Sequence, residues 1–164
     1  MSSCCSGGSC DNSGVRVSGE GACPRCGAVG KLVGDETILS ILKPGLAEGL
    51  LAVERRFCRT PSCAVLYYGA DGRVVEKGAA SVRVGLKETE DPIPLCYCFE
   101  FTRAQVRQEV AETGDSTIPD RIGAEIRAGR CACERMNPSG ACCLGDVRRA
   151  VEEAKAALEV EGRS

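Results

Sequence analysis

The sequence predicts an α+β fold in which a small antiparallel β subdomain precedes a helical subdomain. Between residues 22 and 87, short apolar and β-branched runs alternate with turn residues, as is typical of antiparallel strands. From residue 102 onward, apolar residues recur with helical spacing instead. The intervening segment 88–94 contains Pro92 and Pro94, which cannot donate to a strand ladder, so we place the connector there.

We expect strands at 50–57, 64–68, 73–76 and 81–86. The tripeptide Ala-Asp-Gly at 70–72 is a turn signal between the second and third of them.

Helix signals follow in the second half. Thr102 and Gln105 have the spacing of a capping box and predict a helix that runs to about Thr113. Pro119 suits the first turn of a second short helix, which should end near Gly129. A final helix is indicated by one apolar stripe, which consists of Leu144, Val147, Val151, Ala154 and Leu158.

Three regions are therefore expected along the chain. Residues 1–21 are rich in Ser and Gly and show no apolar period, which predicts a flexible, cysteine-containing tail. Residues 22–90 should form the β subdomain and residues 91–164 the helical subdomain.

Composition narrows the classes of function. With 164 residues, 43% apolar residues and a net charge of -2, the chain shows no basic surface that would bind nucleic acid. No apolar run reaches the roughly 18 to 20 residues that cross a bilayer, and the first ten residues do not resemble a secretory signal. We expect a cytoplasmic protein without membrane insertion.

The sequence holds 13 cysteines and no histidine. An odd count arranged in CxxC and CxC motifs favours thiolate metal sites over a disulfide framework. The lack of histidine removes the usual proton-transfer residue and every histidine-containing zinc site. We therefore expect no hydrolytic enzyme and assign no catalytic residues.

Two cysteine pairs in the β subdomain predict a zinc site. Cys23 and Cys26 form a CxxC motif, and Cys58 and Cys63 form a CxxxxC motif. Zinc takes four tetrahedral ligands, and two such pairs can supply opposite edges of one tetrahedron. We interpret the site as structural because four protein sulfurs leave no open position; the alternatives are a transfer role and a reversible dithiol switch.

The second group of cysteines lies in the helical subdomain. CxC motifs are awkward for a single tetrahedral ion but suit an iron-sulfur cluster, especially near helix ends where backbone donors are free. A second zinc site is the alternative that spacing alone leaves open. The group comprises Cys96, Cys98, Cys131, Cys133, Cys142 and Cys143.

Three further cysteines, Cys4, Cys5 and Cys10, lie in the predicted tail. Closely spaced soft sulfurs can capture Cu(I) in a low-coordinate site. The alternative is a tail whose thiols bind nothing.

These motifs together resemble the N-terminal domain of the CopZ-type copper chaperones. The resemblance covers about residues 22–150, and its matching stretches are 23–26, 58–63, 82–88, 96–98 and 133 with 137–143. It implies a zinc-bearing β subdomain followed by a helical subdomain like bacterioferritin-associated ferredoxin, which holds a 2Fe-2S cluster.

The resemblance also implies ligands. The zinc ligands would be Cys23, Cys26, Cys58 and Cys63. The cluster ligands would be Cys96, Cys98, Cys133 and one of the final pair, for which the family pattern favours Cys143. Cys133 is preferred to Cys131 because it stands at the family's distance from the Asn-Pro-Ser-Gly turn.

The function expected from all of this is that of a metallochaperone-like protein in which a 2Fe-2S centre is coupled to binding or reduction of a soft metal ion such as copper. Chaperones of that family also carry a copper-binding domain with an MxCxxC loop, for which the 164 residues contain no counterpart. The tail cysteines are the candidates to replace it. The alternatives are a ferredoxin-like electron-transfer module and an iron-sulfur sensor, and the expected partners are a metal-transporting ATPase or a redox protein.

Overall fold

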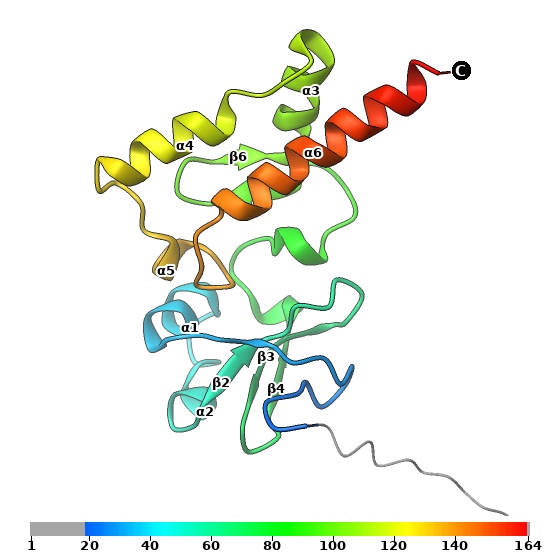
Figure 1. Ribbon diagram of the computed structural model, residues 1–164. Helices are drawn as coiled ribbons and strands as arrows, with labels where there is room; N and C mark the ends of the chain where they lie inside the picture. Colours follow the sequence, from blue (N-terminus) through cyan, green and yellow to red (C-terminus); the bar gives the residue numbers. More distant parts are fainter. Residues whose placement is uncertain (1–18, 164) are drawn as a thin grey trace, which may run out of the picture.

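The computed structural model describes residues 19–163, in which a sheet-containing unit and a helical unit are joined along the chain (Figure 1). The first unit holds a four-stranded antiparallel sheet of order β1-β2-β3-β4. Its strands are β1 (Lys31–Leu32), β2 (Arg55–Phe57), β3 (Val65–Gly69) and β4 (Val74–Glu76). Two short helices, α1 (Asp35–Ile41) and α2 (Glu48–Leu51), and two 3-10 turns, η1 (Lys77–Ala79) and η2 (Gly85–Lys87), complete the unit.

Strand β3 lies at the centre of this unit, and all five of its residues are buried. Its apolar run Val-Leu-Tyr-Tyr is therefore covered on both faces, unlike the alternating pattern of a half-exposed strand. The main core of the unit consists of Val33, Ile38, Ile41, Leu42, Ala47, Leu50, Phe57, Leu66, Tyr67 and Val84.

Two of the predicted strands differ from the structure. The segment 50–57 is a strand only from Arg55, because Leu50 and Leu51 close the helical turn α2. The segment 81–86 is not a strand: it alternates in sequence, but β4 pairs with β3 alone, and residues 85–87 turn into η2. An alternating pattern needs a neighbouring strand, and none of the described strands lies beside this segment.

The second unit begins with a small two-stranded sheet, β5 (Pro94–Cys96) and β6 (Phe101–Thr102). Four helices follow, α3 (Arg103–Thr113), α4 (Ile118–Arg127), α5 (Cys133–Met136) and α6 (Leu144–Glu161). The predicted capping box is confirmed: the Gln105 N–H donates to Thr102 Oγ1 and the Thr102 N–H donates to Gln105 Oε1. The predicted proline in the first turn of α4 is confirmed as well.

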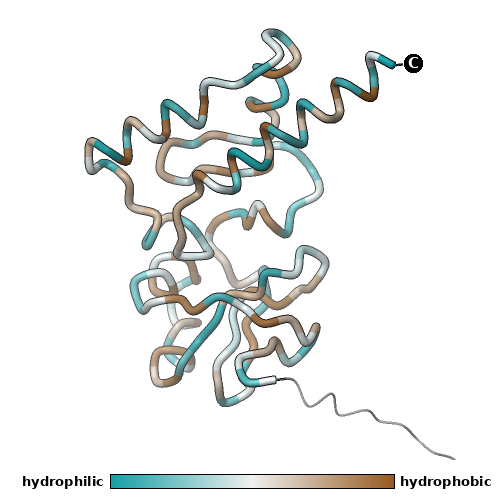
Figure 2. The backbone as a smooth tube through the Cα atoms, viewed as in Figure 1, coloured by the Kyte–Doolittle hydropathy of each residue, from teal (hydrophilic) through white to brown (hydrophobic). Residues whose placement is uncertain are grey.

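Helix α6 packs against α3 and α4 through one apolar face (Figure 1). Polar and apolar residues alternate along α4 and α6 in the hydropathy view, as expected for helices with one buried face (Figure 2). The core of this unit includes Val106, Val110, Ile118, Ile122, Val147 and Val151, together with Cys96, Cys133 and Cys143. Within the described residues, no helix has both the length and the apolar character that crossing a membrane requires.

The two units meet where α1 packs against α5. The Thr37 hydroxyl donates to the Glu134 carbonyl (2.6 Å), and the fully buried Tyr67 donates its hydroxyl to the Pro138 carbonyl (2.5 Å). Gly140 closes the same loop with a φ of 62°, and a Cβ there would lie 2.8 Å from Thr37 Oγ1. The loop between Cys133 and Cys143 is thus fitted against the sheet-containing unit.

Candidate metal centres

The first centre is built from two tight turns that face each other. Cys23 and Cys26 lie in a turn before β1, where the Gly27 N–H donates to the Cys23 carbonyl (2.8 Å). Cys58 directly follows β2 and is held by a bond from its N–H to the Leu66 carbonyl (2.9 Å). Cys63 closes a turn on Thr60 ahead of β3.

The four sulfur atoms of this centre lie within 4.8 Å of one another, and Cys26 Sγ is 3.7 Å from Cys58 Sγ. Four thiolates at the usual zinc–sulfur distance of about 2.3 Å would be about 3.8 Å apart at the corners of a tetrahedron. Cys23 and Cys58 are fully buried and Cys63 is nearly so. The donor set, spacing and burial therefore fit a closed structural zinc ion.

Neighbouring groups tune these thiols before any metal binds. Burial acts to raise the pKa of Cys26, but hydrogen bonds from the Thr60 hydroxyl (3.2 Å) and the Ala28 N–H outweigh it and lower the pKa to about 6. Burial raises the pKa of Cys58 to about 12, although the nearby Lys87 ammonium opposes that shift. Cys26 is thus ready to bind a metal as a thiolate, whereas Cys58 would have to lose its proton on metal binding.

The second centre gathers cysteines from four places in the helical unit. Cys96 ends β5, Cys98 lies in the turn before β6, Cys133 begins α5 and Cys143 directly precedes α6. Cys98 Sγ is 3.7 Å from Cys133 Sγ. Cys143 is buried in the same core as Cys96 and Cys133 and lies close enough to shift the pKa of both thiols.

These sulfur contacts separate the pKa values of the thiols. The hydrogen bond from Cys143 lowers the pKa of Cys133 to about 5 and that of Cys96 to about 7. The same contacts raise the pKa of Cys143, and burial raises the pKa of Cys98 to about 12. Cys143 has a single S–H, which can be donated to Cys96 or to Cys133 at one time, so the protonation of these three thiols is coupled.

Backbone donors around the second centre favour negative charge. The Ala132 N–H donates to Cys98 Sγ (3.3 Å), and Cys143 occupies the N-cap of the 18-residue helix α6. Asn137 shapes the loop between Cys133 and Cys143: its side-chain N–H donates to the Ala141 carbonyl (2.9 Å), and its Oδ1 accepts from the Ser139 N–H (3.0 Å). A purely thiolate donor set with amide donors beside it fits a 2Fe-2S cluster.

A fifth thiol joins this centre. Cys131 Sγ lies 3.2 Å from Cys133 Sγ, and it forms a mutually close group with Cys98 and Cys133. Cys142 is exposed, in contrast to the buried Cys143 beside it. The tail cysteines Cys4, Cys5 and Cys10, proposed from sequence as a Cu(I) site, lie outside the described residues.

The groups that support the first centre, the proposed zinc site, were not identified from the sequence. Thr60 contacts Cys26 by its hydroxyl, and its carbonyl accepts from Lys87, which is only 5% exposed. Lys87 lies in one of the stretches that match the family pattern, but no spacing rule pointed to its role.

Comparisons with known proteins agree with this architecture. The model of the CopZ zinc binding domain family matches residues 20–81. The copper chaperone CopZ of Archaeoglobus fulgidus is 34% identical over an alignment of 143 residues, which covers 85% of this chain and 68% of that protein. The X-ray structure of the N-terminal domain of A. fulgidus CopZ matches with 32% identity and a TM-score of 0.67, over 78% of this chain and 95% of that one. The mixed fold of antiparallel sheet and helices is therefore that of a CopZ N-terminal domain, and the chain belongs to the CopZ family of copper chaperones.

Proposed function

We propose that this protein is a metallochaperone-like protein that holds a structural zinc ion and a 2Fe-2S cluster and handles a soft metal ion such as copper. The observation that carries the proposal is the grouping of free thiols: four sulfurs lie close together in the first centre, three more lie close together in the second, and Cys96 and Cys143 are buried in the same core as the second group. Two thiol-rich centres in one small chain are the chemistry of thiophilic metals. The family relationship to copper chaperones supports copper as the ion handled.

The zinc ligands in this proposal are Cys23, Cys26, Cys58 and Cys63. Cys23, Cys58 and Cys63 pack against Val65 and Tyr68 of the central strand β3, so a bound ion would join the segments 23–26 and 58–63 beside that strand. This part of the protein lacks a large aromatic core, so a metal cross-link is a physically sufficient way to hold it.

The cluster ligands in this proposal are Cys96, Cys98, Cys133 and Cys143. When bound, a 2Fe-2S cluster supplies a one-electron couple, so its reduced form can convert one Cu(II) to Cu(I) while returning to the oxidised form. The protein surrounds these sulfurs with the core of α3, α4 and α6 and leaves Cys98 and Cys131 partly exposed. That edge is where an electron would enter from a redox partner or leave to a metal ion.

Copper itself requires a separate binding group, because four cysteines would already saturate the cluster. The proposed candidates are Cys4, Cys5 and Cys10, which would hold Cu(I) and pass it to an incoming thiolate of a partner such as a metal-transporting ATPase. Ligand exchange at a low-coordinate copper ion needs no unfolding of the protein.

A second candidate function is that of a ferredoxin-like electron carrier. The partly exposed Cys98 and Cys131 favour it, because a cluster near the surface shortens the path to a docked redox protein. In this alternative the tail cysteines bind no copper.

Anaerobic purification with metal analysis and EPR tests the proposal. We expect one zinc and two irons per chain, a reddish-brown colour, no EPR signal as isolated and an S = 1/2 signal after one-electron reduction. A colourless, iron-free protein from cells with adequate iron would refute the cluster, and zinc in the second centre would favour a two-zinc protein instead.

A further inference from the structure

Lys87 is a buried cation that contacts the zinc-type centre. Its ammonium donates to the carbonyls of Thr60 (2.8 Å) and Cys63 (2.9 Å), which belong to the loop that supplies two of the four sulfurs. Among residues 19–163, Lys87 makes no ion pair, and the adjacent Glu88 is engaged by Lys77 and Arg83 instead. A buried ammonium without a countercharge is costly. One Zn²⁺ with four thiolates would carry a net charge of about -2 and supply that countercharge.

The turn that carries Lys87 also presses on the strand that leads into the second centre. Gly85 opens the 3-10 turn η2, and a Cβ at this position would lie 1.9 Å from the Pro94 carbonyl oxygen in β5. Only glycine permits this approach. Two residues after Pro94, β5 ends at Cys96.

Tyr97, which lies between two proposed cluster ligands, stabilises the contact between the Gly85 turn and β5. The Tyr97 hydroxyl accepts from the Gly85 N–H (2.8 Å) and donates to the Arg83 carbonyl (2.9 Å). Because Tyr97 lies between Cys96 and Cys98, its position fixes the loop that carries both sulfurs.

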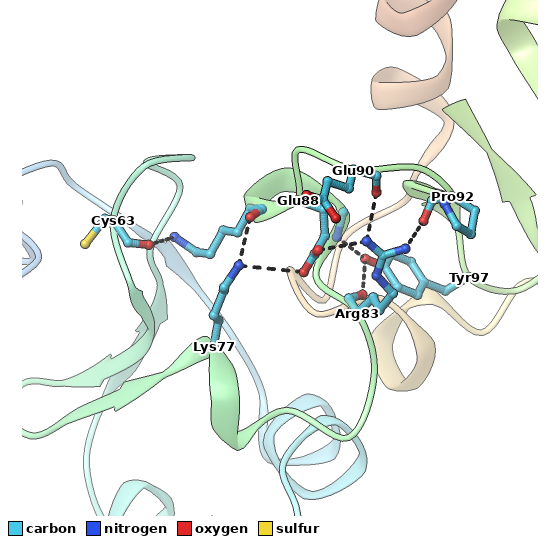
Figure 3. A network of polar contacts seen from close by, with 9 residues as sticks. Cys63, Lys77, Arg83, Glu88, Glu90, Pro92 and Tyr97 are labelled. Carbon is cyan, nitrogen blue, oxygen red and sulfur yellow. Dashed lines mark hydrogen bonds and ion pairs between the residues drawn. The ribbon is translucent and has the colours of Figure 1, made fainter. Parts of the chain in front are cut away.

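Arg83 holds the turn in place from its other side. Its guanidinium donates to the Glu88 carboxylate (2.9 Å), to the Glu90 carbonyl (2.8 Å) and to the Pro92 carbonyl. Figure 3 shows Arg83 among these acceptors with Tyr97 next to it, and Lys77 bridging toward Glu88 on the side of Cys63. The turn 83–88 between the two centres is thus held by hydrogen bonds and ion pairs on both of its sides.

We propose that the turn 83–88 couples the two metal centres, with Lys87 as the countercharge and loop anchor of the zinc centre and Gly85 with Tyr97 as the support of the Cys96–Cys98 loop. Zinc binding then slows the loss of iron from the cluster, although the two sites share no ligand. The inference rests on the proposed identity of both metals and assigns to the turn a role that neither metal site requires by itself.

Zinc release from the purified, metal-loaded protein tests the role of Lys87. Lys87→Met should speed zinc transfer to a chromogenic chelator by about 10- to 100-fold, the usual effect of removing an outer-shell partner, while Lys87→Arg should recover most of the slow release. Lys43→Met is the matched control, because the exposed Lys43 also donates to one backbone carbonyl (Gly78, 2.9 Å) but to none of the residues 83–88.

Iron release to a ferrous chelator tests the coupling. Tyr97→Phe removes both hydroxyl bonds and should raise the iron-loss rate of zinc-loaded protein about tenfold, to the rate of zinc-stripped wild type, with bound zinc unchanged. Thr113→Val is the control, because the Thr113 hydroxyl likewise makes two backbone bonds, donating to the Glu109 carbonyl and accepting from the Asp115 N–H at the end of α3, and its loss should leave the iron-loss rate unchanged. If zinc release from Lys87→Met and iron release from Tyr97→Phe both keep the wild-type rate, the coupling is wrong but the proposed function stands. If the wild-type protein itself contains no zinc or no iron, the proposed function is wrong.

Discussion

Replacing Cys58 by alanine should unfold the sheet-containing unit and leave the helical unit folded. Cys58 is fully buried, its sulfur lies 3.7 Å from that of Cys26, and its N–H is bonded to β3. The small core around it contains Cys23, Cys58, Cys63, Val65 and Tyr68, so three of its five buried members are proposed ligands. The substitution therefore removes a ligand and opens the centre of that core together.

The expected loss exceeds the stability that this unit can have without metal. Structural zinc contributes about 10–16 kcal/mol in small domains. A unit of about 70 residues has a net stability of roughly 4–10 kcal/mol. Losing most of the metal's contribution should therefore unfold the β unit. The core around Cys96, Cys133 and Cys143 is built from α3, α4 and α6 and should persist.

The assay combines zinc analysis, circular dichroism and the visible spectrum of the cluster. Cys58→Ala should bind less than one zinc, lose strand signal and keep the cluster bands, while releasing iron to a chelator as fast as zinc-stripped wild type. Cys142→Ala is the matched control, because this cysteine is exposed and should be silent in all three measurements. A Cys58→Ala protein that keeps a full equivalent of zinc and its thermal stability would refute the reasoning, as would a disulfide among these cysteines in reduced wild-type protein.

Three further predictions follow from the same centres. Cys133→Ala should abolish the reduced-state EPR signal while Cys131→Ala keeps the iron, and the reverse pattern would reassign the ligand. A chain that begins near residue 21 should keep zinc and cluster but lose one Cu(I) equivalent in anaerobic titration against a competing chelator; equal binding by both chains would favour the electron carrier. Directly after a chelator withdraws zinc, before the β unit unfolds, Cys26 should be alkylated first at pH 7, because its pKa is lowered from 9.0 to about 6 and, unlike Cys133, it is not buried. The rate of Cys26 labelling should fall about tenfold per pH unit below about 6. The folding free energy that the lowered pKa contributes should be complete above pH 9.0 and be lost as the pH falls through about 6. A labelling rate that does not depend on pH would contradict this.

The helical half of the fold could be predicted from sequence because its signals are local. The capping box at Thr102, the proline at 119 and the apolar stripe of the last helix each define an element through residues three or four apart. The strands at 64–68 and 73–76 were also close to the observed β3 and β4, because a turn signal separates them.

The first half was harder because tertiary packing decides its short elements. Helix α1 was missed: Thr37, Ile38 and Ile41 are β-branched and suggest a strand, yet they are the buried face of a helix that packs on α5. Its acidic first turn, Asp35 and Glu36, was the available signal. A seven-residue helix with this composition depends on its partner, which lies about a hundred residues away in sequence.

The same dependence on distant partners explains which parts of the candidate centres the sequence could reveal. Cysteine spacing indicates which thiols belong together, because a CxxC or CxC motif acts over a few residues. It does not reveal that Tyr67 of the central strand supports Pro138 in the loop before Cys143, or that Lys87 supports the carbonyl of Cys63. These contacts join residues 71 and 24 positions apart and become visible only in the folded chain. Each contact joins a cysteine-bearing loop to a distant residue: Tyr67 of β3 reaches the loop before Cys143, and Lys87 of the connecting turn reaches the loop of Cys63. The two centres therefore belong to one structure, in which the sheet-containing unit supports a loop of the second centre.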